Sequence, residues 1–267
     1  MLLRLSEYLR LYVGLSTLGV LCLLWSALAV PLYPLLPARY AEPLGRWMIM
    51  RGFWFYLHSL QFIGACRFDL SELDVLRAEK QGLILAPNHP SLLDAVMVIS
   101  KFPNIACIMK STLMDSIFFG SGARIARYIR NDPPLHMINE AVRTLQRGSF
   151  LLLFPEGTRT ITPPLNTCKP SAGLIAKRAC VPVQTLLIET NSLFLGKRWP
   201  LFRRPDMPMI YRIRLGKRFA APSGDVNEFV EEMETYLRDE LQRATLQPPA
   251  PQTNASSTEF PERQPYA

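Results

Sequence analysis

A histidine and an aspartate five residues apart follow a short apolar run. His89 and Asp94 lie in the segment 88–94, which reads Asn-His-Pro-Ser-Leu-Leu-Asp and comes directly after the apolar residues 83–87. Within one regular helix, five residues at about 100° each would put the two side chains about 140° apart. They can meet only if His89 lies in the loop before the helix. A carboxylate there could keep one ring nitrogen protonated and leave the other as a base.

A second apolar run ends in a block that suits anion binding. Residues 155–160 read Pro-Glu-Gly-Thr-Arg-Thr. Gly157 allows close approach of the backbone, Thr158 offers a hydroxyl, and Arg159 offers a guanidinium fork that fits a phosphate. Ligands of open α/β sheets bind beyond the carboxyl ends of strands, and both blocks stand at such ends. A local salt bridge between Glu156 and Arg159 is the alternative.

The two blocks together resemble the glycerolipid acyltransferase family, most closely its bacterial 1-acylglycerol-3-phosphate acyltransferases. The resemblance covers roughly residues 62–218. In that family the His-x4-Asp pair is the catalytic dyad, and the Phe-Pro-Glu-Gly-Thr-Arg block binds the phosphate of the acceptor. The resemblance therefore implies transfer of a fatty acyl group from a thioester to the hydroxyl of a lysophospholipid, with 1-acylglycerol-3-phosphate giving phosphatidate.

The resemblance also assigns roles to particular residues. His89 is expected to accept the proton of the acceptor hydroxyl, and Asp94 to orient its ring. Glu156 is expected to orient Arg159 or to accept an acceptor hydroxyl. The full set of expected substrate-binding residues is Asn88, Lys110, Glu156, Gly157, Thr158 and Arg159. No metal set and no cofactor are expected, and acyl-CoA or acyl-carrier protein serves as co-substrate.

One position departs from the family pattern and leaves the acceptor open. The family has an arginine that assists phosphate binding where this chain has Asn131, and Arg130 stands one residue earlier. Adjacent residues of a strand point to opposite faces, so Arg130 cannot simply replace it. Transfer to a hydroxyl or amine of another lipid or of a polyene therefore stays possible. A thioesterase or lipid hydrolase with the same dyad also fits the sequence, as does a non-catalytic membrane adaptor.

Composition favours a lipid partner over nucleic acid. The chain is 49% hydrophobic with a mean hydropathy of +0.09, a net charge of +8 and a pI near 9.4. A basic surface could meet nucleic acid, anionic lipid or an acidic carrier protein, but no nucleic-acid-binding module is visible. Cys22 and Cys107 sit in apolar runs, which predicts buried free thiols in a reducing compartment.

The N-terminal part predicts membrane attachment. Residues 11–36 contain no charged side chain and are long enough to cross about 30 Å of hydrocarbon. Residues 47–62 are rich in aromatic side chains and predict an interfacial or a buried helix. The segment 197–204 combines four cations with aromatic rings, which suits either an anionic membrane interface or a solvated loop. With the resemblance, these features imply a bacterial inner-membrane protein whose catalytic domain faces the cytoplasm.

The expected fold is α/β, a mixed sheet flanked by helices, with a membrane-associated helical segment at the N-terminus. Three parts are expected: residues 1–61 as the membrane-anchoring segment, 62–246 as the acyltransferase domain, and 247–267 as a disordered tail. Besides 83–87 and 149–154, strands are predicted at 65–70, 104–110, 181–188 and 209–215. Helices are predicted after the His89 loop as far as Ile99 and over 113–127, 135–147, 170–179 and 226–246.

Overall fold

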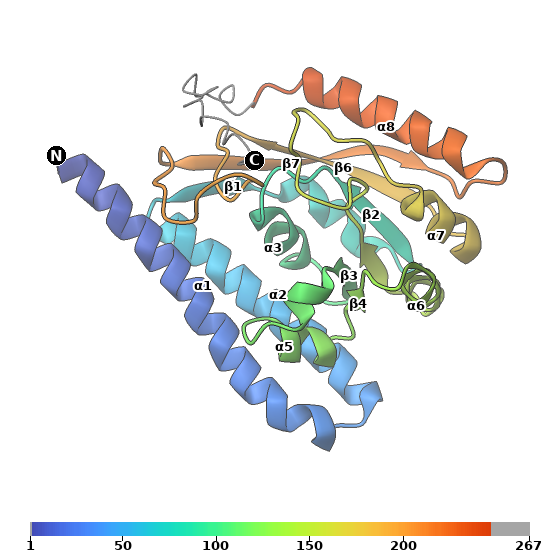
Figure 1. Ribbon diagram of the computed structural model, residues 1–267, viewed down its shortest axis with the longest axis horizontal. Coiled ribbons are helices and arrows are strands. Elements are labelled where there is room, and N and C mark those ends of the chain that lie inside the picture. The colour runs from blue at the N-terminus through green and yellow to red at the C-terminus, as the bar shows by residue number, and fades with distance from the viewer. Residues whose placement is uncertain (1, 247–267) are drawn as a thin grey trace, which may run out of the picture.

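Seven strands form one mixed sheet with helices on both faces in the computed structural model, which describes residues 2–246 (Figure 1). The strands are β1 (Cys66–Asp69), β2 (Leu83–Pro87), β3 (Ile105–Met109), β4 (Ile129–Arg130), β5 (Phe150–Leu152), β6 (Val183–Thr190) and β7 (Met209–Phe219). Their order is β1-β7-β6-β2-β5-β3-β4. All neighbouring strands are parallel except β6 and β7, which are antiparallel. The predicted mixed α/β sheet is thus confirmed.

The strand β2 shows why the apolar runs are continuous. Leu83 and Leu85 join the core on one face of the sheet, while Ile84 joins the core on the other. Successive side chains of a strand point to opposite faces, so a central strand covered on both faces must be apolar throughout. The first core includes residues of α3 (Leu93–Ile99), and the second is formed with α6 (Pro134–Gln146), α7 (Ser171–Ala179) and α8 (Val226–Gln242).

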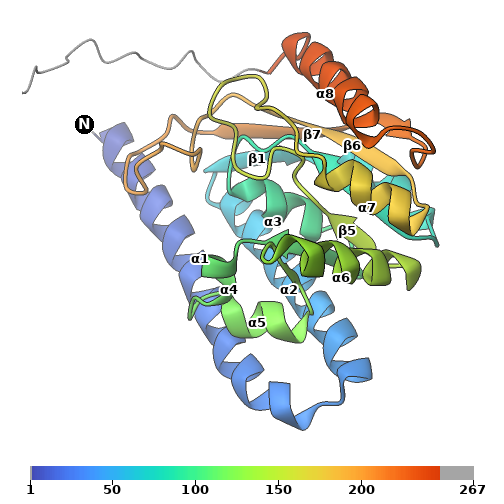
Figure 2. The same cartoon turned by 45° about the vertical axis from the view of Figure 1, so that its right-hand side comes forward.

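Two long helices precede the sheet and run side by side (Figures 1 and 2). They are α1 (Leu2–Leu35) and α2 (Ala38–Phe62). Pro31 and Pro34 lie inside the last turns of α1, and the chain then turns back into α2. The second helix begins at Ala38 and not at Trp47, so the predicted segment 47–62 is only its carboxyl-terminal part.

Polar contacts tie α1 to the rest of the fold at two points. Arg10 Nη1 donates to the carbonyl of Gly64 over 3.2 Å, and Ser26 Oγ donates to the carbonyl of Phe118 over 3.0 Å. Sixteen residues separate Arg10 from Ser26, which is about 24 Å of helix. Residues 5–35 are long and apolar enough to cross a membrane by length and composition, and most of this stretch is not buried in the protein. The helix therefore lies along the flank of the domain.

A buried arginine fastens α2 to the amino-terminal side of the sheet. Arg46 Nε donates to the carbonyl of Ala126, and its Nη1 donates to Asn104 Oδ1 over 2.7 Å and to Ser149 Oγ over 2.9 Å. Glu42 pairs with Nη2 at 2.7 Å. Only 2% of Arg46 is exposed, and these partners compensate for burying its charge.

The predicted helix over 113–127 is wrong as a single element. It is replaced by α4 (Ser111–Met114) and α5 (Gly120–Ile125), with a turn between them. The turn brings this segment against α1, where a Cβ at Gly122 would collide with the indole of Trp25. Between β1 and β2 the chain forms a 3-10 helix over Ser71–Ala78. The predicted tail 247–267 lies outside the described residues.

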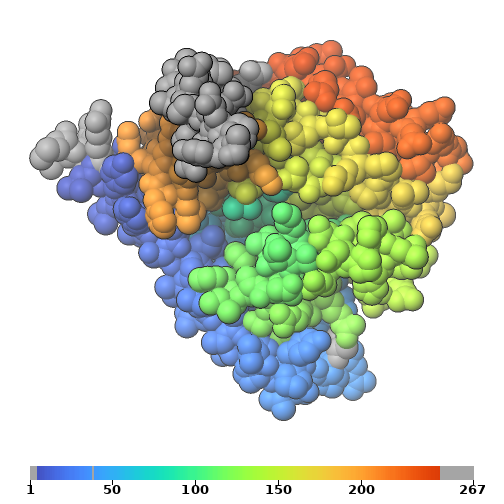
Figure 3. All heavy atoms as spheres, in the orientation of Figure 1, coloured from blue at the N-terminus to red at the C-terminus, as the bar shows by residue number. Residues whose placement is uncertain are grey.

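Residues 191–208 form a long connection between β6 and β7, which we call the strap. At one end the Leu92 N–H donates to the carbonyl of Leu195 over 3.2 Å. At the other, the Phe202 ring stacks on Tyr12 of α1, and Arg204 pairs with Glu7. In the space-filling view the orange strap lies against the blue N-terminal part of α1 (Figure 3). The strap thus joins α1 to the loop that contains His89.

Candidate active site

The neighbouring strands β2 and β5 bring the two sequence blocks together. They are parallel partners, with Leu83 opposite Phe150 and Leu85 opposite Leu152. Their carboxyl ends therefore meet at one edge of the sheet. The loop after β2 contains His89, and the loop after β5 contains Glu156 and Arg159.

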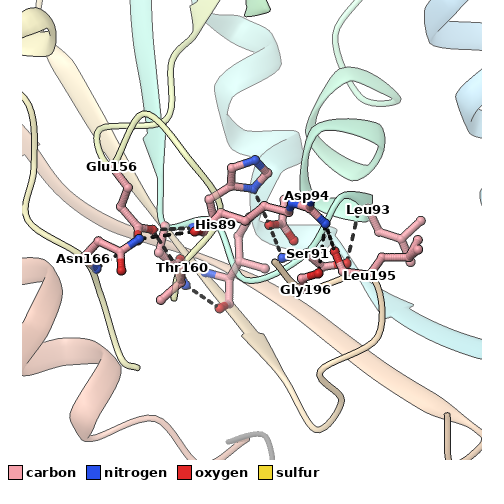
Figure 4. Close-up of polar contacts among 12 residues, drawn as sticks. His89, Ser91, Leu93, Asp94, Glu156, Thr160, Asn166, Leu195 and Gly196 are labelled. Carbon is pink, nitrogen blue, oxygen red and sulfur yellow. Dashed lines mark hydrogen bonds and ion pairs between the residues drawn. The ribbon is translucent and has the colours of Figure 1, made fainter. Parts of the chain in front are cut away.

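His89 and Asp94 meet directly. His89 lies in the loop before α3, and its Nδ1 is 2.8 Å from Asp94 Oδ2 in the first turn of that helix (Figure 4). The Ser91 N–H also donates to this oxygen over 2.7 Å. Burial raises the pKa of Asp94, whose side chain is fully buried, while the hydrogen bond from His89 opposes that rise. With Nδ1–H donating to Asp94, the other ring nitrogen is left unprotonated and basic.

An aromatic ring fixes the plane of the imidazole. The His89 ring stacks on Phe154 with 3.7 Å between ring centroids and 18° between planes. Its Nε2 points away from Asp94 and makes no hydrogen bond to any described residue (Figure 4). The histidine side chain is 13% exposed, so Nε2 remains within reach of a substrate.

Glu156 holds the backbone of His89 and does not contact Arg159. Its Oε1 accepts from the His89 N–H and from Thr160 Oγ1, both over 2.8 Å, and its Oε2 accepts from the Asn166 N–H over 2.9 Å (Figure 4). Burial raises the pKa of Glu156, and these hydrogen bonds oppose the rise. The carboxylate is 2% exposed and both of its oxygens are used. Glu156 therefore does not orient Arg159 in this structure, and both of its oxygens are taken up by donors of the protein.

Arg159 is anchored by one of its nitrogens. Its Nη1 donates to the carbonyls of Leu195 over 2.8 Å and Gly196 over 2.9 Å, both in the strap. Its Nε and Nη2 make no hydrogen bond within residues 2–246 and can bind a ligand. Burial lowers the pKa of Arg159, and the negative charge of Asp94 opposes this. Half of the guanidinium is thus positioned and half is available.

The remaining predicted site residues differ in their surroundings. Asn88 is buried, and its amide bonds the backbone of Ile188 twice, donating over 2.9 Å and accepting over 2.7 Å. It joins β2 to β6, which favours a positioning role over substrate contact. Lys110 is exposed at the end of β3, and its side chain contacts none of the described residues by hydrogen bond or ion pair. Gly157 has φ = +66°, a conformation that favours glycine.

Around Asn131, where the family pattern has an arginine, the neighbouring Arg130 is not free to bind a phosphate. Arg130 pairs with Asp115 at 2.8 Å and with Asp132 at 3.3 Å. Asn131 Oδ1 accepts from the Ser111 N–H over 3.1 Å. Two cations that were not predicted as site residues lie near Gly157 and Thr158: Lys169 in the later part of the loop after β5, and Lys197 in the strap. Neither belongs to a motif, and the strap brings Lys197 to this loop from a distant part of the sequence.

Comparison with known proteins agrees with this geometry. Residues 67–189 match the protein-family model described as Acyltransferase. The chain is 26% identical over 184 residues to a 1-acyl-sn-glycerol-3-phosphate acyltransferase of Pseudomonas aeruginosa, which covers 66% of this chain and 67% of the relative. It is also similar in structure to the 1-acyl-sn-glycerophosphate (LPA) acyltransferase PlsC of Thermotoga maritima, with a TM-score of 0.57 and 17% identity over 84% of this chain and 95% of that one. At that identity the structural likeness supports the fold alone.

Proposed function

Because residues 67–189 match the Acyltransferase family model, we propose that the chain transfers a fatty acyl group from a thioester to the hydroxyl of a lysophospholipid, 1-acylglycerol-3-phosphate in the first place. The observation behind the proposal is the pair His89 and Asp94, whose loop is joined by Glu156 to the loop after β5 that contains Arg159. The donor is acyl-CoA or acyl-carrier protein.

The reaction needs one base and no covalent enzyme intermediate. His89 Nε2 accepts the proton of the acceptor hydroxyl while the hydroxyl oxygen bonds to the thioester carbon. The carbon–sulfur bond then breaks, and the departing thiolate takes the proton from the imidazolium. Asp94, which accepts from Nδ1–H, stabilises the positive charge that the ring holds between these two transfers.

Ser91 is held away from nucleophilic chemistry. Its hydroxyl donates to the carbonyl of Phe194 over 2.9 Å and accepts from the Leu93 N–H over 3.2 Å. It is fully buried. The hydroxyl therefore orders the loop between His89 and α3, which supports direct attack by the acceptor.

The proposal includes attachment to a membrane through α1. The helix exposes large apolar side chains along its length, among them Leu9, Val20 and Leu28. An acyl acceptor that resides in the bilayer has to reach His89 from that surface. Free cysteines fit a reducing compartment, so the proposed location is the bacterial inner membrane with the catalytic domain on the cytoplasmic side.

A different acceptor is the second candidate, and a specific observation favours it. Arg130 is occupied by two aspartates and Asn131 by the backbone of Ser111, so the arginine contact usual in the family is absent. The same dyad would then acylate a hydroxyl or amine of another lipid or of a polyene.

The test is acyl transfer by purified protein in detergent. Labelled acyl-CoA or acyl-carrier protein is supplied with lysophosphatidate, and product is compared between the wild type and His89→Ala. Dyad-dependent phosphatidate supports the proposal. Dyad-dependent release of free fatty acid at the same rate with and without acceptor would replace it by a thioesterase. An intact protein that forms no product from lysophosphatidate but acylates another lipid would assign the second candidate.

A further inference from the structure

The tip of the strap is a closed turn with two apolar side chains at its centre. The Arg203 N–H donates to the carbonyl of Pro200 over 3.0 Å, and the indole Nε1 of Trp199 donates to the carbonyl of Arg203 over 3.1 Å. Leu201 and Phe202, the two central residues, are 48% and 62% exposed. Small and polar residues dominate such positions in most turns. The turn is therefore well formed and yet presents apolar groups to its surroundings.

The apolar tip continues a row of exposed side chains on α1. The Phe202 ring stacks on Tyr12 with 6.2 Å between ring centroids, and Tyr12 stacks on Tyr8 at 6.5 Å (Figure 3). Leu5, Tyr8, Leu9 and Tyr12 are all exposed, and their i, i+3, i+4, i+7 spacing puts them on one face of the helix. A single exposed apolar side chain is ordinary, but a contiguous patch that extends over two elements marks an interaction surface.

Two arginines beside this tip have no carboxylate partner. The Arg203 guanidinium lies over the Trp199 ring, with 4.8 Å from its Cζ to the ring centroid, and it forms no ion pair within residues 2–246. Arg198 is exposed, and its side chain makes no hydrogen bond or ion pair to any residue of that range. Both cations are therefore free to bind an anion outside the protein.

The surface around the tip keeps an excess of positive charge. Glu7 is the only acid of α1, and Arg204 pairs with it. The strap itself has four cations and a single acid, Asp206. Positive charge interleaved with rings and aliphatic side chains fits an anionic lipid leaflet, in which the rings lie at headgroup depth and the cations meet phosphates.

The extent of the apolar patch favours a bilayer over an acidic protein as the partner. An acidic carrier protein would match the cations of the strap. The exposed apolar side chains, however, continue along α1 from Leu5 to Leu35, which is about 45 Å of helix. A bilayer surface covers that whole length together with the strap.

The other end of the strap is fixed on the loop of the dyad. The Ser91 hydroxyl donates to the carbonyl of Phe194 over 2.9 Å. The Phe194 ring packs edge-on against Trp199, whose indole closes the turn. Phe194 precedes Phe202 by only eight residues. A membrane held at the tip of the strap is therefore close to the loop that contains His89.

We infer that the turn 199–203 is a second membrane-contact element, in which Leu201 and Phe202 enter the headgroup region of an anionic leaflet and Arg198 and Arg203 contact its phosphates. The inference rests on the proposed attachment through α1. Residues 11–36 of that helix have no charged side chain on any side, so α1 alone leaves the rotation of the domain about the helix axis undetermined. The strap fixes this rotation and holds the loop of the dyad at the lipid surface.

The test reports lipid contact at single positions of the full-length protein in vesicles. Leu201→Cys is made in a Cys180→Ser background, because Cys180 is exposed and the other four cysteines are buried. The thiol is labelled with a fluorophore, and quenching by a lipid-attached quencher is measured. Glu231→Cys, an exposed position of α8 on the other face of the sheet, is the matched label control.

In vesicles that contain phosphatidylglycerol, the label at 201 should be quenched and the label at 231 should not. Arg198→Gln combined with Arg203→Gln should lower the ratio of bound to free tip roughly thirtyfold, because each cation near an anionic leaflet strengthens the contact about fivefold. High salt should have the same effect on the wild type. Arg143→Gln combined with Arg178→Gln removes two exposed cations from α6 and α7 and should leave the quenching unchanged.

Three results would overturn the inference, and each is distinct. A label at 201 that stays unquenched while a label at Leu9 is quenched would remove the strap from the membrane contact and leave the attachment through α1 standing. Unquenched labels at both positions would reject that attachment as well. Quenching at 201 that is equal in phosphatidylcholine vesicles and unchanged in the double arginine variant would show that anionic lipid is not recognised.

A protein partner would give a different result. In that case vesicles would leave the label at 201 unchanged, and an acidic acyl-carrier protein would change its emission. Loss of this change in the double arginine variant would assign the surface to the carrier protein and overturn the membrane contact.

Discussion

At the scale of single residues, His89 is fixed from three directions. Asp94 bonds its Nδ1, the Phe154 ring stacks on its face, and Glu156 holds its backbone N–H. Only Nε2 is left without a partner in the described part of the chain. Because the ring cannot rotate freely, the proposed reaction would present the substrate hydroxyl with a base that is already oriented.

The dyad should therefore account for most of the rate. His89→Ala and Asp94→Asn are each expected to lower kcat by about 10²–10⁴-fold, the usual effect of removing a general base or its orienting partner. Initial rates of acyl transfer measure this, with melting curves to show that the variants stay folded. His136→Ala, an exposed histidine on α6, serves as the control. Wild-type turnover in His89→Ala would refute the mechanism.

Glu156 should act on the rate through His89. In Glu156→Gln an amide N–H₂ group replaces one carboxylate oxygen, so a donor faces the N–H of either His89 or Asn166. A mismatch of about 1–3 kcal/mol predicts a fall in kcat of roughly tenfold or more, with little change in the KM of the acceptor. Glu232→Gln, at an exposed ion pair with Lys217, is the matched control. A change confined to KM would instead assign Glu156 to substrate binding.

Sequence alone predicted the dyad but not its supports. The spacing of His89 and Asp94 required a loop position, and the structure has one. The partners of Glu156 could not be predicted, because Thr160 and Asn166 lie in a segment without periodicity. Lys169 and Lys197 were missed for the same reason: their positions depend on where two irregular connections fold back.

At the scale of elements, the attachment of α2 depends on Arg46. Its guanidinium bonds Asn104, Ser149 and the carbonyl of Ala126. These partners precede or flank the strands β3, β4 and β5, so one side chain fixes the helix against the start of three strands. Asn104 and Ser149 each stand just before an apolar run. Nothing in the sequence indicated that Arg46 would bond them.

Removing that guanidinium should destabilise the whole fold. Arg46→Met takes the donor away from the buried hydroxyl of Ser149, from the buried carbonyl of Ala126 and from the partly buried Glu42, and the loss of unfolding free energy is expected to be about 3 kcal/mol. Urea unfolding in detergent, followed by circular dichroism, measures it. Arg51→Met, an exposed position about one and a half turns along the same helix, should cost less than about 1 kcal/mol. Equal effects of the two changes would contradict the role of Arg46.

Helices and strands were predicted correctly where the local sequence pattern determines them. The prediction failed for residues 113–127, which pack against α1. The strands β2, β3, β6 and β7 and the helices α6, α7 and α8 follow apolar runs or helical spacing, and each is close to its predicted range. The segment 113–127 has apolar spacing too. It breaks because Phe118 and Ser121 bond Ser26 of α1, a contact more than ninety residues away in sequence.

At the scale of the whole molecule, α1 lies along the domain, which bears on how the protein sits in a membrane. A helix that crossed the bilayer would draw its neighbours Gly64 and Phe118 into the hydrocarbon with it. Both contacts belong to the catalytic domain, and polar backbone at that depth is costly. The packing therefore favours attachment to one leaflet over crossing of the bilayer. The sequence of residues 11–36 did not distinguish these two arrangements.

Depth measurements along α1 distinguish the two arrangements. Single cysteines labelled with a fluorophore at Leu9, Val20 and Leu28, all exposed, would be probed with lipid-attached quenchers in vesicles. For a helix lying in one leaflet we expect similar depths at the three sites. A deep label at 20 between shallow labels at 9 and 28 would mean that the helix crosses the bilayer.

The pairing of β1 with β7 also has a consequence for biosynthesis. The first strand of the sheet bonds only the last, so Cys66–Asp69 have no partner until Met209–Arg212 have been made. The helices α1 and α2 are made long before this, and part of the apolar surface of α1 stays uncovered until α5 and then the strap have followed. During that interval a nearby bilayer is the surface that can shelter them. With the proposed membrane attachment, the nascent chain can therefore meet its membrane before its sheet is complete, and the pairing of β7 with β1 then completes the sheet.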